Sequence, residues 1–141
     1  MRKLRKLAVG IVAVLLVLVA AGCTGRSIVI SWSPIPIVVK PGDMNIKGTV
    51  TIRATGTFGS LYIDTVSAVV FDEDGNPIEE YTQELKVNVT IPPFVGGTRS
   101  EDVTLNVTYD DIETRRIAKV VVQVTGSDPG KLEVDVIRQQ P

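Results

Sequence analysis

Residues 85–91 read Leu-Lys-Val-Asn-Val-Thr-Ile, so that every second residue is apolar and the residues between are polar. Successive side chains of a β-strand point to opposite faces of a sheet, and this alternation therefore predicts a strand with one buried and one exposed face. Most of the apolar positions hold β-branched residues, which suit a pleated surface. The stretch thus predicts sheets that are covered on one side only, as in two stacked sheets.

The same alternation returns along the chain from residue 27 to residue 136, and turn-forming residues at 41–43, 72–77 and 126–130 interrupt it. Prolines break the segment 33–36, and we expect this segment at a sheet edge because proline cannot donate to a ladder. Beyond them, Ile35, Ile37 and Val39 should share one face. Residues 117–125 are nearly all apolar and predict a central strand, whereas residues 110–114 predict a short helical turn. Seven to nine short strands of this kind predict an all-β, antiparallel sandwich.

Residues 61–112 have a distinctive order of features. An apolar strand is followed by Asp-Glu-Asp-Gly-Asn-Pro at 72–77, Ile-Pro-Pro-Phe at 91–94, and a strand ending in Tyr-Asp-Asp-Ile at 109–112. This order resembles small immunoglobulin-like domains of prokaryotic lipoproteins and, more distantly, LEA14/WHy-type sandwiches, although the Asn-Pro-Asn motif of the WHy group is missing. The resemblance implies an immunoglobulin-like β-sandwich of 7–9 strands over residues 27–141, and it implies no activity.

The first 23 residues have the composition of an export signal. Four basic residues lie at positions 2–6, and residues 7–21 form an apolar run of 15 residues that ends just before the only cysteine, Cys23. This run is shorter than the ~20 residues that a membrane-spanning helix needs. Its end resembles the lipobox of prokaryotic lipoproteins, although Ala20 stands where that family prefers Leu.

We therefore expect residues 1–22 to be a lipoprotein signal peptide and residues 23–26 to be a lipidated tether, with acyl chains on Cys23. The alternative is an uncleaved membrane anchor in which Cys23 has no function. Both interpretations place the remaining residues on the extracytoplasmic side of the cell membrane, because the basic flank stays in the cytoplasm.

The composition of the remaining 119 residues suits one domain and limits its partners. Four of the 15 Lys and Arg residues lie in the signal, which leaves 11 against 16 Asp and Glu and a net charge of −5. An acidic domain argues against nucleic acid and against an anionic membrane surface as partners. The chain has no histidine, the commonest general base and transition-metal ligand, and we expect neither a cofactor nor catalysis.

One acidic segment is similar in spacing to a calcium-binding loop. Asp72, Asp74 and Asn76 match the opening of an EF-hand, but Pro77 and Gln83 stand where that loop needs Gly and a bidentate Glu. We expect a polar hairpin tip here and no metal site.

Two triplets, Asn88-Val89-Thr90 and Asn106-Val107-Thr108, are acceptor sequences for N-glycosylation. The alternation directs both asparagines away from the core, as a glycan requires. Chance explains the triplets equally well, because Asn and Thr are common on exposed strand faces; an archaeal source would favour glycosylation.

The segment Pro92-Pro93-Phe94-Val95 places apolar residues in a loop. Phe94 either folds back to cap the sandwich or, with Pro93 and Val95, contacts a partner, because exposed aromatic residues commonly anchor interfaces.

We expect a non-catalytic, lipid-anchored cell-surface protein that acts as a binding or structural module, held to the membrane through Cys23 and in contact with a protein partner. One alternative is an accessory subunit that docks onto a membrane complex or surface layer through a sheet edge or the Phe94 loop. The other is a small cation-dependent surface enzyme using carboxylates such as Asp110, Asp111 and Glu113.

Overall fold

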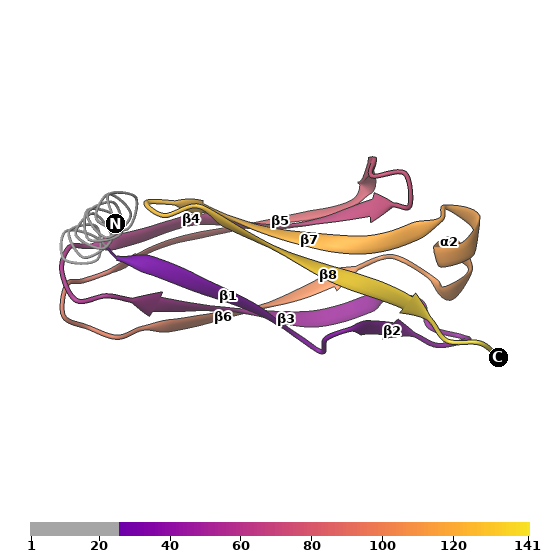
Figure 1. The fold of residues 1–141 in the computed structure, drawn as a ribbon, viewed down its shortest axis with the longest axis horizontal. Coiled ribbons are helices and arrows are strands. Elements are labelled where there is room, and N and C mark those ends of the chain that lie inside the picture. Colours follow the sequence, from indigo (N-terminus) through magenta and orange to yellow (C-terminus); the bar gives the residue numbers. More distant parts are fainter. Residues whose placement is uncertain (1–25) are drawn as a thin grey trace, which may run out of the picture.

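The computed structural model describes residues 26–141, which fold into two stacked sheets (Figure 1). A three-stranded sheet has the order β1-β3-β6, and a five-stranded sheet has the order β2-β8-β7-β4-β5. The elements are β1 (Ser27–Ser33), β2 (Ile37–Val39), β3 (Ile46–Thr55), β4 (Leu61–Asp72), β5 (Pro77–Ile91), β6 (Thr98–Leu105), α2 (Tyr109–Thr114), β7 (Ile117–Gly126) and β8 (Gly130–Arg138).

The strand order is that of an immunoglobulin-like domain. β1, β3 and β6 take the places of strands A, B and E, while β4, β7 and β8 take those of C, F and G, with β5 added beside C. All strand pairs are antiparallel except the short pair β2 and β8, which is parallel. The predicted all-β, immunoglobulin-like sandwich is confirmed, with eight strands in the described part of the chain.

The proline-containing segment carries the chain from one sheet to the other. β1 lies at the edge of the three-stranded sheet, and after the bend at residues 34–36 β2 joins the edge of the five-stranded sheet, as the prolines predict. Ile37 and Val39 are buried as expected, but Ile35 is 60% exposed, so its predicted place on their face is wrong. The reason is that Ile35 lies in the bend, where the strand alternation is interrupted.

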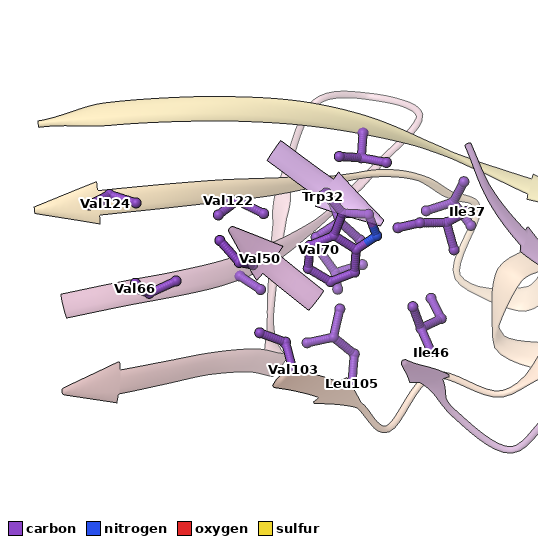
Figure 2. Packing of buried hydrophobic residues seen from close by; sticks show 14 of the residues in the cluster. Trp32, Ile37, Ile46, Val50, Val66, Val70, Val103, Leu105, Val122 and Val124 are labelled. Carbon is purple, nitrogen blue, oxygen red and sulfur yellow. The ribbon is translucent and has the colours of Figure 1, made fainter. Parts of the chain in front are cut away.

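The core lies between the sheets and includes the only tryptophan, Trp32 of β1. Its indole is 3% exposed and lies among Ile37, Ile46, Val70 and Leu105 (Figure 2). The neighbouring strand β3 makes room for the ring at Gly48, where an added Cβ would lie only 2.0 Å from Trp32 Cζ2. Glycine at this position is therefore a packing requirement of the indole.

The stretch 85–91 forms the end of β5, an edge strand of the five-stranded sheet. Its alternation holds, but Leu85, Val87 and Val89 are only half-buried and pack against the rim of the core. A bulge in the pairing with β4 puts Asn88 at φ +48°, a left-handed conformation that asparagine tolerates better than most residues.

The two remaining local predictions are confirmed. β7 is interior, between β8 and β4, and the helical turn is α2. The expected end of the preceding strand at residues 109–112 is wrong: β6 ends at Leu105, although Val107 stays buried, and α2 begins at Tyr109 because Thr108 and Asp111 form a capping box there. Within residues 26–141 no helix has the length and apolar character needed to cross a bilayer.

Candidate functional site

Two loops meet at the end of the sandwich where β1 begins (Figure 1). Residues 56–60 join β3 to β4, and residues 92–97 join β5 to β6. They expose Phe58 (48%), Phe94 (71%) and Val95 (50%), and the two aromatic rings touch edge to face with centroids 5.5 Å apart. We call these three residues the apolar tip.

Backbone hydrogen bonds hold the tip in place. The N–H of Phe94 donates to the Thr57 carbonyl at 2.8 Å, and the N–H of Ala54 donates to the Gly97 carbonyl at 2.8 Å. Phe94 has φ +66°, which is uncommon for a bulky residue and which places its side chain outside the sandwich. The surrounding contacts thus maintain a strained backbone that exposes an aromatic ring.

Arg26 fixes the start of the domain to the same loop. Its guanidinium donates to the carbonyls of Pro92 and Val95 and, at 3.5 Å, to that of Ile91. Arg26 is 8% exposed, and charge-assisted hydrogen bonds to carbonyls replace the hydration of its two terminal guanidinium nitrogens, whereas its buried Nε has no hydrogen-bond partner in the described part of the chain. Arg26, expected in the tether, therefore packs as part of the sandwich.

The sequence indicated one of the two loops that form the tip. Phe94 does not cap the core, and its predicted contact with a partner, together with Pro93 and Val95, stays a prediction. Phe58 was not predicted from the sequence. An aromatic residue in a loop of small residues, such as Phe58 in 56–60, could have been recognised in the same way as Phe94 in its loop. Nothing in the sequence pointed to Arg26, because its partners lie 65 to 69 residues away.

Both predicted glycosylation triplets have exposed asparagines, Asn88 and Asn106, as the alternation indicated. Each triplet also has a structural function. The Asn88 side-chain carbonyl accepts a hydrogen bond of 2.8 Å from the Tyr62 hydroxyl, and Thr108 caps α2. These functions explain the residues without a glycan, and glycosylation itself stays a prediction.

The acidic segment at 72–77 forms the hairpin turn between β4 and β5. The carboxylate of Asp72 accepts hydrogen bonds from the N–H groups of Asp74 (3.0 Å) and Asn76 (2.9 Å), as in an Asx turn. Glu73 and Asp74 pair with Arg116, and the hydrogen bond to Glu73, followed by the charge of Asp74, raises the pKa of the Arg116 guanidinium.

The carboxylates of α2 are engaged separately. Asp111 caps the helix, and Glu113 pairs with Arg138 at 3.0 Å. Across residues 26–141 no three His, Cys, Asp or Glu side chains come together as potential metal ligands. Cys23 lies outside the described residues.

The chain matches no protein-family model and no curated protein. Among solved structures, the Pseudomonas fluorescens alkylpurine DNA glycosylase AlkC bound to abasic-site DNA shares 15% identity at a TM-score of 0.49, over 81% of this chain and 31% of that one. The ligand-binding region of serine-glutamate repeat protein A of Enterococcus faecium shares 16% identity at a TM-score of 0.36, over 82% and 99% of the two chains. A Listeria innocua β-glucosidase shares 13% identity at a TM-score of 0.41, over 79% of this chain and 16% of that one.

The chain thus spans about a third of the glycosylase and about a sixth of the glucosidase. These similarities are too distant to assign the chain to a family or to an activity.

Proposed function

We propose that this chain is a non-catalytic, lipid-anchored protein of the cell surface, in which Cys23 carries the anchor and the immunoglobulin-like domain is a binding or structural module. The membrane anchor comes from the signal sequence and its terminal cysteine. The sandwich presents contact surfaces to its surroundings, and the apolar tip is the first of these surfaces.

One observation carries the proposal: Arg26, only three residues after Cys23, already packs against the sandwich. Three residues of extended chain span about 11 Å at most. A signal sequence that leads directly into a sandwich suits a domain held at the membrane surface, because no room is left for a second functional unit between anchor and domain.

A second candidate, an accessory subunit that docks through a sheet edge, is favoured by β5. This strand is 15 residues long, and among the described strands it pairs only with β4, so its outer backbone groups are free to accept a further strand. A photo-crosslinker at Glu84 of β5 should then give a discrete adduct in native membranes, whereas one at the exposed Gln123 of β7, which pairs with β4 on one side and β8 on the other, should not. Equal labelling from both positions would contradict edge docking.

The anchor is tested by fractionation of cells that express the full chain. The wild-type chain and the control Thr24→Ser should stay with the membranes through high-salt washing and should be released by detergent. Cys23→Ser should accumulate as an unprocessed precursor or leave the mature domain unattached. If Cys23→Ser is processed and retained like the wild type, the lipid anchor is wrong.

A further inference from the structure

We propose that the apolar tip, Phe58, Phe94 and Val95, inserts into the headgroup layer of the membrane that holds the anchor. The sandwich would then stand on the bilayer, with α2 and the C-terminus pointing away from it. This inference rests on the proposed membrane anchor, and it identifies the partner of the tip as lipid. It holds equally if the signal segment is retained as an uncleaved anchor, because both forms hold residue 23 at the membrane surface.

The tip lies close to the anchoring residue. Arg26 donates to the carbonyls of Pro92 and Val95, which places the first described residue within one arginine side chain of the Phe94 loop. From Cys23 to Arg26 the chain reaches about 11 Å. The headgroup layer on each side of a bilayer is itself roughly 5–8 Å deep. An anchor at Cys23 therefore keeps the tip against the membrane surface.

Charged residues are also distributed unevenly along the long axis of the sandwich. The loops 56–60 and 92–97 read Gly-Thr-Phe-Gly-Ser and Pro-Pro-Phe-Val-Gly-Gly, and they contain no charged residue. The opposite end, which holds the β4–β5 turn and α2 (Figure 1), contains Asp72, Glu73, Asp74, Asp110, Asp111, Glu113, Arg115 and Arg116. Uncharged, aromatic loops at one end of the elongated domain and a cluster of charged side chains at the other match a membrane-facing and a solvent-facing pole.

The charge of the domain also specifies the lipid. A mature domain with a net charge of −5 is repelled by an anionic membrane surface. Zwitterionic headgroups carry no net charge and do not repel the domain, so its uncharged tip can approach them. The turn between β7 and β8 contributes one carboxylate at this end, Asp128, and that carboxylate accepts a hydrogen bond of 3.0 Å from the Ile28 N–H. We therefore expect insertion into phosphatidylcholine without any need for anionic lipid.

The test uses the full, anchored chain reconstituted in phosphatidylcholine vesicles with or without brominated acyl chains, which quench nearby tryptophans. In Phe94→Trp the new indole should lose emission in brominated vesicles and shift to shorter wavelength on reconstitution. The matched control Asp74→Trp, at the opposite end, should show neither effect. The native Trp32 is buried in the core and gives a background that is common to all variants.

The outcomes separate the inference from the proposed function. If the chain fails to float with the vesicles, the anchor itself fails and the tip placement falls with it. If the chain floats but Phe94→Trp is quenched no more than Asp74→Trp, the anchor stands and the tip placement is overturned. A photo-crosslinker at Phe94 that labels a protein and no lipid in native membranes would assign the tip to a protein partner and would also overturn it.

Discussion

Gly48→Ala should strongly destabilise the domain, because β3 has no room for a side chain beneath the indole of Trp32. The added Cβ would lie 2.0, 2.3 and 2.8 Å from Trp32 Cζ2, Cε2 and Cη2. Carbon atoms in contact are normally about 3.5–4.0 Å apart, so the ring would have to move by more than 1 Å. The rigid indole is enclosed by side chains such as Val70 and Leu105, which are fully buried (Figure 2).

Overpacking a core by one methyl group typically costs about 1–3 kcal/mol, and the absence of a flexible neighbour puts this substitution near 3 kcal/mol. In a domain of this size such a loss should lower Tm by about 10 °C. Urea and thermal unfolding of residues 26–141, followed by circular dichroism, measure both quantities. Gly96→Ala is the matched control, because an added Cβ there meets no atom within 4 Å; its stability should change by less than about 0.5 kcal/mol.

A double-mutant cycle identifies the cause. Trp32→Leu removes the ring and should cost about 2–3 kcal/mol by itself, but in that background Gly48→Ala should cost less than about 1 kcal/mol. The coupling energy between the two substitutions should therefore be about 2 kcal/mol, because the double mutant should lose less stability than the sum of the two single mutants. If the two costs add, or if Gly48→Ala is harmless alone, the packing of Trp32 against Gly48 is not what requires glycine.

Three further predictions concern a turn, the Arg26 contacts and an alkaline titration. Gly75→Val should cost about 1–3 kcal/mol in thermal unfolding because Gly75 has φ +82°, and an equal loss in Gly96→Val would refute this reason. Arg26→Met should speed amide hydrogen exchange in loop 92–97 and cost about 1–3 kcal/mol, since it leaves the Pro92 and Val95 carbonyls without their donor; unchanged exchange would contradict it. Burial, then the charge of Asp111, raises the pKa of Tyr81, so folding stability should be intact below the ordinary pKa of about 10 and decline as pH rises through the folded-state value. Tyr81→Phe should weaken that decline, and an identical pH profile would exclude Tyr81 as its source.

The alternation of apolar residues predicted the strands because burial on one face of a sheet is a local property of the sequence. Although β6 ends at Leu105, every second residue remains buried as far as Val107. The half-burial of Leu85, Val87 and Val89 could not be foreseen, because it depends on the position of β5 at a sheet edge. Strand order is set by pairing between distant segments, which the local pattern does not contain.

The candidate site was also only partly predictable, because its contacts join residues that are distant in the sequence. Phe94 was predictable from its loop composition, but its contact with Phe58 joins residues 36 positions apart. Arg26 falls within residues 23–26, which the sequence predicts to be a tether, and only the fold brings the Pro92 and Val95 carbonyls to its guanidinium. The bulge at Asn88 likewise requires the register of β4 against β5.

The central claim, a lipid anchor on Cys23 directly before the sandwich, is tested most directly by the mass of the mature protein extracted from membranes with detergent. We expect a chain that has lost residues 1–22 and carries acyl chains on Cys23, with the added mass confined to the N-terminal peptide. A mature protein with an intact N-terminus, or one that begins at Cys23 without lipid, would contradict it.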